Sequence, residues 1–162
     1  MRKMLCLILA FSLLFLTGCK QEEPEIEVPV KFYYCAREVT FHNEHGVFQY
    51  EQREAKDLMD DYVALMNLYL SGPVSEHLIS PFPRRLTATA VSVNGSNVTI
   101  ALSSTIAILT DIRLTKACAC IALTLFDLTQ ANTVTIHAIV PAFGESKSYT
   151  ISRQDLALLD IG

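Results

Sequence analysis

Apolar side chains recur every three or four residues in two stretches of the chain, a period that is typical of helices. The first stretch is Glu54–Leu70, where charged residues fill the opposite face. We expect Gly72 and Pro73 to end this helix, because glycine can adopt the left-handed cap conformation and proline cannot continue a helix. The second stretch, Asp111–Leu128, is more apolar, which predicts a well-buried helix with Asp111 as a candidate N-cap.

Other stretches alternate apolar and polar residues, or are rich in aromatic and β-branched side chains, and these predict strands. The pair Asn94-Gly95 lies between two alternating stretches and is typical of the tight turn of a hairpin. The expected strands are Val30–Thr40, Val47–Glu51, Thr87–Val93, Val98–Leu102 and Thr133–Val140, with a short one from Tyr149 that leads into a terminal turn or helix.

Strands interrupted by two helices predict an α+β fold. We expect a two-layer sandwich in which both helices pack on one face of a mixed sheet, in the order β(β)αββαβ followed by a tail. Residues 30–162 are long enough for one domain with its own core. Residues 19–29 combine charge with two prolines and few apolar residues, which predicts a flexible tether.

The start of the chain has the layout of a secretion signal, with two basic residues before the apolar run Met4–Leu16. This run is shorter than the roughly twenty residues that a membrane-spanning helix needs. Its end, Leu16-Thr17-Gly18-Cys19, resembles a bacterial lipobox. The resemblance implies removal of residues 1–18 and attachment of fatty acyl chains such as palmitate to Cys19. We therefore expect a lipoprotein anchored at the extracytoplasmic face of the cell membrane.

Charge and cysteine content narrow the function classes. Without Arg2 and Lys3 the chain has 11 basic and 17 acidic side chains, so its formal net charge is −6. This charge disfavours binding to nucleic acid and unassisted binding to anionic lipid. Beyond the signal and Cys19 the chain has three cysteines, too few for a dense disulfide framework. One bridge from Cys35 to Cys118 or Cys120, or buried free thiols, fits this count.

Two sets of residues could be read as metal ligands. His42-Asn43-Glu44-His45 is the densest, but it lacks the His-Glu-x-x-His spacing that aligns two histidines on a helix, and we expect a solvated turn. Asp57, Asp60 and Asp61 fall on the polar face of the first helix, where a solvated surface is the simpler interpretation. No metal site or cofactor is expected.

Candidate catalytic groups are also sparse. Cys118 and Cys120 are two residues apart on a helix, so their side chains point in different directions and cannot share a metal or bond to each other. His77 and His137 are distant in sequence, and no serine has the Gly-x-Ser-x-Gly context of a nucleophile. These patterns favour a protein that is not an enzyme.

Several short motifs follow one another along residues 30–162. The chain opens with the aromatic strand Phe32-Tyr33-Tyr34, then has Glu51-Gln52-Arg53 and the helix end Leu65–Pro73. The later motifs are Ile79–Pro83, Val91–Ile100, Leu123–Leu125 and Val134–Ile136. This ordered set resembles the GerM domain family of sporulation and spore germination. The positions that carry the family signature are Arg53, Gly72, Pro73 and Gly95.

The resemblance implies a fold similar to the ring-building modules of the sporulation transenvelope channel, and a role in assembling or supporting an envelope complex. The partner is then an envelope protein or further copies of the chain, in a hetero- or homo-oligomer. The chain departs from the family pattern at Ala101–Ser104, where members often have an acidic residue and Leu-Ser. It also departs at Pro141–Gly144, where a glycine commonly follows the last strand.

We expect the partner to bind at a sheet edge or at the loop Pro81–Arg85, where Phe82, Arg84 and Arg85 are candidate contacts. The alternative is a lipoprotein outside sporulation that binds cell wall or a small ligand. The absence of tryptophan, and tyrosines placed mostly for core packing, count against the aromatic-lined pocket that this alternative needs.

Overall fold

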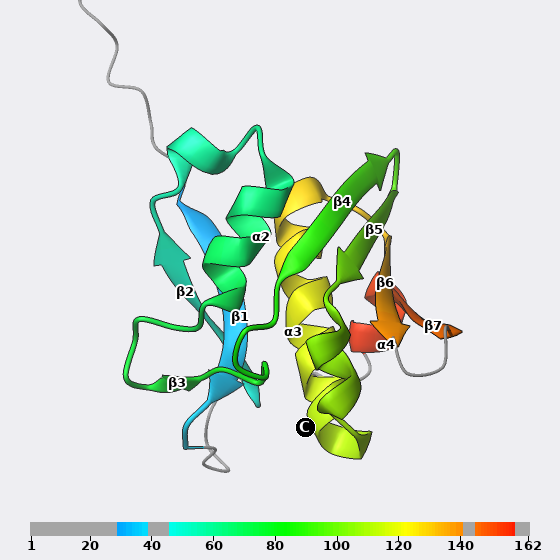
Figure 1. Ribbon diagram of the computed structural model, residues 1–162. Helices are drawn as coiled ribbons and strands as arrows, with labels where there is room; N and C mark the ends of the chain where they lie inside the picture. Colours follow the sequence, from blue (N-terminus) through cyan, green and yellow to red (C-terminus); the bar gives the residue numbers. More distant parts are fainter. Residues whose placement is uncertain (1–28, 39–45, 141–144, 158–162) are drawn as a thin grey trace, which may run out of the picture.

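The computed structural model describes residues 29–38, 46–140 and 145–157. The expected signal, the lipobox and the His42–His45 set lie outside these ranges. The described chain forms two β-sheets, with helix α3 between them (Figure 1). The strands are β1 Val30–Ala36, β2 Phe48–Arg53, β3 Leu78–Ile79, β4 Ala88–Asn94, β5 Asn97–Leu102, β6 Thr133–Val140 and β7 Glu145–Ser152; the helices are α2 Tyr62–Leu70, α3 Asp111–Thr129 and α4 Arg153–Ala157, with short 3-10 helices η2 Lys56–Leu58 and η3 Ser104–Ile108.

The first sheet has the strand order β2-β1-β3, and β1 runs antiparallel to both neighbours. Alternate side chains of β1 enter the core, so Phe32 and Tyr34 are fully buried. The strand expected at Val30–Thr40 ends at Ala36 in the structure. Strand β3 was not predicted, because two residues are too few to show a period.

The second sheet has the order β4-β5-β6-β7 and is mixed, since β5 and β6 are parallel and the other pairs are antiparallel. The expected hairpin is confirmed, but its turn lies one residue later than predicted. Asn94 pairs with Asn97, so Gly95 and Ser96 form the turn. Gly95 has a φ of +59°, and a positive φ at the first turn residue is the pattern of a type II′ turn, which favours glycine there.

The first predicted helix, Glu54–Leu70, is divided in the structure into η2 and the shorter α2. The reason is Asp61, whose carboxylate accepts hydrogen bonds from the main-chain N–H groups of Val63 and Ala64, both at 3.0 Å. An aspartate in this arrangement is an N-cap, and it starts a new helix where the apolar period had suggested continuity. The predicted end is confirmed, with Gly72 in a conformation of φ +109° just beyond the helix.

Helix α3 matches the expected length and burial, but its first turn differs from the prediction. Asp111 is the first helical residue, with a φ of +49°, and Thr110 occupies the N-cap position without a side-chain cap. The expectation that Asp111 caps the helix was therefore wrong. At the other end Gln130 adopts the left-handed conformation, with a φ of +57°.

The α+β class is confirmed, and the strands form two sheets where a single mixed sheet was expected. Side chains from the helices bind main-chain groups at one strand edge of each sheet. Tyr33 of β1 donates from its N–H to Thr124 Oγ1 at 3.0 Å and accepts at its carbonyl from the Tyr69 hydroxyl at 2.7 Å. Asn67 binds Ala88 of β4 in the same way, through 2.9 and 3.1 Å bonds to its N–H and carbonyl. These side chains take the place of a neighbouring strand.

Candidate functional site

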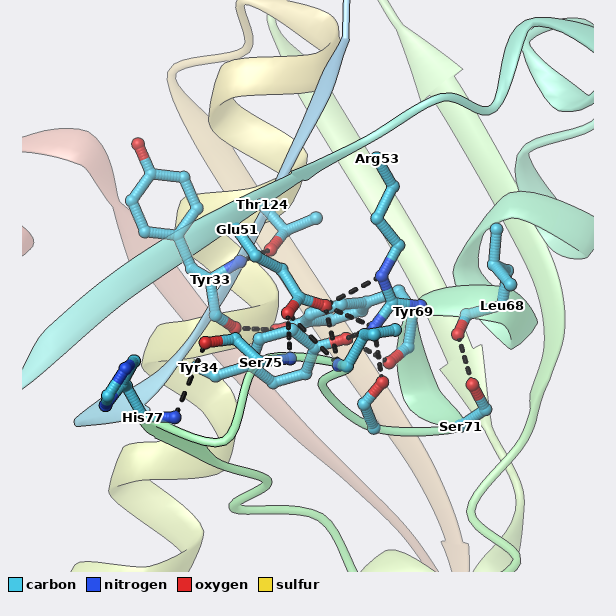
Figure 2. Close-up of polar contacts among 12 residues, drawn as sticks. Tyr33, Tyr34, Glu51, Arg53, Leu68, Tyr69, Ser71, Ser75, His77 and Thr124 are labelled. Atoms are coloured by element: carbon cyan, nitrogen blue, oxygen red, sulfur yellow. Dashed lines mark hydrogen bonds and ion pairs between the residues drawn. The ribbon is translucent and has the colours of Figure 1, made fainter. Parts of the chain in front are cut away.

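The main polar cluster of the first sheet is an ion pair between Glu51 and Arg53. The two residues lie two positions apart on β2 and therefore on the same face of the strand. Arg53 Nε donates to Glu51 Oε1 at 2.7 Å, and Arg53 Nη2 donates to the same oxygen and to the carbonyl of Gly72 (Figure 2). The Arg53 and Glu51 side chains are only 12% and 11% exposed. The pair is thus largely removed from water.

Glu51 also binds the loop that follows α2. Its carboxylate accepts from the N–H of Ser75 at 2.9 Å and from the N–H of Val74 at 3.1 Å. We call this arrangement of Glu51 and Arg53 on residues 72–75 the Glu51–Arg53 clamp. The clamp fixes this loop to β2, because Arg53 binds the carbonyl of Gly72 and Glu51 binds the amides of Val74 and Ser75.

The clamp controls the ionisation of Glu51. Burial alone would raise the pKa of this carboxyl, but the Ser75 amide, the Arg53 guanidinium and the Val74 amide together hold the pKa below its ordinary value of 4.5. A carboxyl with a depressed pKa in the folded state stabilises the protein above its unfolded pKa, and this stabilisation is lost as pH falls through the folded pKa.

We therefore expect the free energy of unfolding to fall as pH is lowered from above 4.5 into the acid range, and Glu51→Gln to remove part of that dependence. Urea unfolding at a series of pH values measures both slopes. The control is Asp57→Asn, on the exposed surface of η2, which should leave the slope as it is. Equal slopes for the native protein and Glu51→Gln would contradict the role assigned to the clamp.

Aromatic rings pack beneath the clamp. Tyr69 lies with its ring centroid 5.3 Å from that of Phe32, 5.1 Å from Tyr34 and 5.0 Å from Phe82. The Tyr34 hydroxyl donates to the Tyr69 carbonyl at 2.7 Å, and Arg53 Nη2 reaches the same hydroxyl at 3.3 Å. Burial raises the pKa of Tyr69 well above its ordinary value, so its hydroxyl stays a donor. The cluster is a hydrogen-bonded part of the core.

The structure brings together three of the four family-signature positions. Arg53 binds the Gly72 carbonyl, and Pro73 follows directly in the clamped loop. Gly95 is in the β4–β5 turn, away from the clamp. Sequence reasoning missed Glu51 as a member of this group, because the predicted strand ended at Glu51. Strand β2 continues to Arg53 in the structure and places both side chains on one face.

The candidate partner contacts of the loop Pro81–Arg85 differ in exposure. Phe82 is partly buried, and its ring packs edge-on against those of Tyr34 and Tyr69. Arg84 and Arg85 are exposed, and Arg85 has a φ of +66°. Phe82 thus anchors the loop, and the two arginines are its most exposed residues.

Strand β4 provides an open sheet edge. Because Asn94 and Asn97 flank a two-residue turn they form a hydrogen-bonded pair, and pairs alternate along the hairpin. The main-chain N–H and C=O groups of Val91 and Val93 therefore point away from β5. Among the residues that the structure describes, neither has a hydrogen-bond partner on that side. From Thr87 to Asn94 the strand carries no charged residue and no proline.

The remaining sequence candidates are dispersed. His137 on β6 is within 2.7 Å of the Ser148 hydroxyl on β7, and His77 is exposed in the loop before β3. Cys118 and Cys120 are both buried free thiols. Asp61 is the cap of α2, and Asp57 and Asp60 are exposed near it. Within the described ranges no group of three or more His, Cys, Asp or Glu side chains could hold a metal ion.

A pocket of about 470 Å³ lies between α3, β7 and α4. Its polar lining is already engaged, since Thr115 donates to the carbonyl of Asp111 and Asp155 accepts from Ser152. The pocket therefore offers mainly apolar surface. Its lining residues are Leu114, Thr115, Cys118, Ala119, Tyr149, Thr150, Ile151, Asp155 and Leu156.

Comparison with known proteins identifies the fold. No protein-family profile and no curated protein matches the sequence. The structure is similar to the tandem GerMN domains of the sporulation protein GerM from Bacillus subtilis, with a TM-score of 0.52 and 18% identity over 74% of this chain and 42% of that one. It also matches a proposed lipoprotein from Clostridium perfringens, with a TM-score of 0.39 and 17% identity over 79% and 89% of the two chains.

The expected GerM-like fold is thus confirmed. The chain spans less than half of the tandem GerMN structure. In the described residues, no helix is long and apolar enough to cross a membrane.

Proposed function

We propose that this protein is a lipid-anchored, non-enzymatic module at the extracytoplasmic face of the cell membrane, which uses its GerM-like domain to join an envelope protein. The contact surface is the outer edge of β4, and the process served is envelope assembly in sporulation or spore germination. The observation that carries the proposal is the open, uncharged edge at Val91 and Val93.

An unpaired strand edge is a template for another strand, and natural proteins usually protect such edges with charge, proline or a covering element. Among the described residues, only Asn67 protects strand β4, at its start, where it binds both main-chain groups of Ala88. Beyond a register shift between Ala88 and Ala90, no strand in the described part of the chain pairs with this edge. A partner strand added there gains main-chain hydrogen bonds for affinity and side-chain contacts for specificity.

The opposite edge of the same sheet is a weaker candidate. Strand β7 carries the exposed Lys147 and continues directly into α4, which interrupts the edge. A lysine on an edge strand opposes pairing because its charge would have to be desolvated or neutralised. The two edges of the sheet thus differ in chemistry, and β4 is the one suited to strand addition.

The polar groups support a binding role over catalysis. Both groups of the Glu51–Arg53 clamp bind partners within the chain, which favours a structural role for the pair over acid or base chemistry on a substrate. The lipid anchor follows from Leu16–Cys19, and residues 19–29 are suited to hold the domain clear of the headgroups. A tethered domain with an exposed strand edge can search for a partner on the same membrane.

The test is photo-crosslinking from position 92 on the exposed β4, using the full lipidated protein in native membranes followed by mass spectrometry. We expect capture of an envelope protein, and at least a tenfold loss of capture with Val93→Pro. Proline removes the outward N–H of Val93 and leaves the β4–β5 ladder intact, because that N–H does not face β5.

Val93→Thr is the matched control, since it keeps the N–H and a β-branched side chain. Circular dichroism should show that both variants remain folded. Equal capture by the two variants, or capture of abundant bystander proteins alone, would contradict the proposed edge contact.

A further inference from the structure

Cys35 and Cys120 are far apart in sequence but meet where β1 lies against α3. The contact can be followed from the bond between the Tyr33 N–H and Thr124 Oγ1, at 3.0 Å. Cys35 is two residues after Tyr33, about 6.6 Å along a strand, and Cys120 is four residues before Thr124, about 6 Å along a helix. Strand and helix run in opposite directions (Figure 1), so the two steps bring the cysteines together.

The side-chain contacts agree with this geometry. The Cys35 and Cys120 thiols lie close enough for each to shift the pKa of the other. Cys120 is fully buried, whereas 8% of Cys35 is exposed, so Cys35 is the less buried residue of the pair. Cys118 is buried on another face of α3, where it lines the pocket beside Tyr149. It has no cysteine neighbour among the described residues.

We propose that Cys35 and Cys120 are a site of reversible disulfide formation, with Cys35 as the sulfur that reacts first and Cys120 as the resolving sulfur. The oxidant is a disulfide donor of the class to which oxidised glutathione belongs. The bond links the first sheet to α3 at Cys35, where β1 pairs with β3.

The pKa values of the two thiols favour this order of reaction, in which Cys35 reacts before Cys120. The hydrogen bond from Cys120 lowers the pKa of Cys35 to about 7 against the effect of burial, and the charge of Lys116 adds to the lowering. Burial raises the pKa of Cys120 well above its ordinary value. Cys35 is therefore the better thiolate near neutral pH, and the thiolate is the form that attacks a disulfide.

The exchange proceeds in two balanced steps. Cys35 attacks the donor disulfide, which forms a mixed disulfide and releases one donor thiol that takes up a proton. Cys120 then gives up its proton and attacks the Cys35 sulfur, which releases the second donor thiol. Two protein thiols are oxidised by two electrons in total, and one donor disulfide is reduced to two thiols.

The test uses the full chain extracted from membranes in detergent, reduced, and then equilibrated with oxidised and reduced glutathione in varying ratio. Acid quenching, alkylation of free thiols and peptide mapping report the state of each cysteine. In the oxidising mixtures we expect one peptide pair joined through Cys35 and Cys120, lighter by two hydrogen atoms, with Cys118 fully alkylated. Excess reduced glutathione should reverse the bond.

Cys118→Ser is the matched control and should form the same bond as the native chain. Cys120→Ser should stop at a glutathione adduct on Cys35, and Cys35→Ser should form no adduct on Cys120. A bond between Cys35 and Cys118, glutathione on Cys120, or three alkylated thiols in the most oxidising mixture would overturn the proposal. The native chain and Cys118→Ser decide this even where a variant at Cys35 or Cys120 fails to fold.

Discussion

Replacing Tyr69 with leucine is expected to lower the free energy of unfolding by about 4 kcal/mol, since it removes a large, fully buried ring and its hydroxyl together. The ring contacts those of Phe32, Tyr34 and Phe82, and such aromatic pairs contribute beyond the area they bury. The hydroxyl binds the Tyr33 carbonyl on the otherwise unpaired edge of β1. Urea unfolding followed by circular dichroism measures the loss.

Tyr69→Phe is the matched control, because it removes the hydroxyl and keeps the ring. We expect a loss of about 1 to 2 kcal/mol, the cost of leaving the partly buried Tyr33 carbonyl unpaired. The difference between the two variants then reports the packing of the ring. If Tyr69→Phe were as stable as the native protein, the hydroxyl would not serve as the substitute for a neighbouring strand.

Replacing Arg53 with methionine is expected to cost about 3 kcal/mol of unfolding free energy. Methionine retains much of the apolar stem, which in the native chain holds the guanidinium 5.3 Å from the centre of the Phe32 ring. It leaves the Glu51 carboxylate without its cation and the Gly72 carbonyl without its donor, both in a site that is largely closed to water. Chemical unfolding at neutral pH is the measurement.

A second ion pair supplies the comparison for Arg53. Lys31 and Asp127 approach to 3.7 Å, but their side chains are 35% and 37% exposed. Asp127→Asn should therefore change the free energy of unfolding by less than about 1 kcal/mol, as is usual for exposed pairs. Similar losses for Arg53→Met and Asp127→Asn would mean that the Glu51–Arg53 clamp contributes no more than a surface contact.

These variants also distinguish effects on the stability of the domain from effects on the proposed contact with a partner. The clamp and the aromatic cluster stabilise the loop after α2, whereas the proposed partner site is the outer edge of β4 at Val91 and Val93. A variant such as Val93→Pro should alter capture of the partner while the domain remains folded. Arg53→Met should instead shift unfolding, with capture retained wherever the protein is still folded.

Local chemistry made most of the elements predictable. The strand Thr133–Val140 was expected with the bounds that the structure has, because β-branched residues there have no competing helical period. The end of α2 was predictable because Gly72 and Pro73 act through their own backbones. The order of short motifs was sufficient to predict a GerM-like fold, since it records the succession of elements.

The helix and turn boundaries that were predicted incorrectly have local causes, which the spacing of apolar residues does not reveal. The carboxylate of Asp61 caps α2 and divides the first predicted helix, and a window of apolar positions does not register a single capping bond. The hairpin turn moved from Asn94-Gly95 to Gly95-Ser96, because the register of β4 on β5 determines which two residues remain unpaired. A side-chain cap therefore sets the first of these boundaries, and the register of one strand pair sets the second.

The sequence by itself determined the succession of strands and helices and the class of fold, because these depend on period, turn chemistry and caps within a few residues. Tertiary structure alone decided that Arg53 binds the Gly72 carbonyl, that Cys35 meets Cys120 rather than Cys118, and that Tyr69 and Thr124 bind the main chain of Tyr33 at the edge of β1. Those contacts join residues that are distant along the chain. Once the helices have packed, some strand edges and buried polar groups are left unpaired, and these determine which residues bind each other.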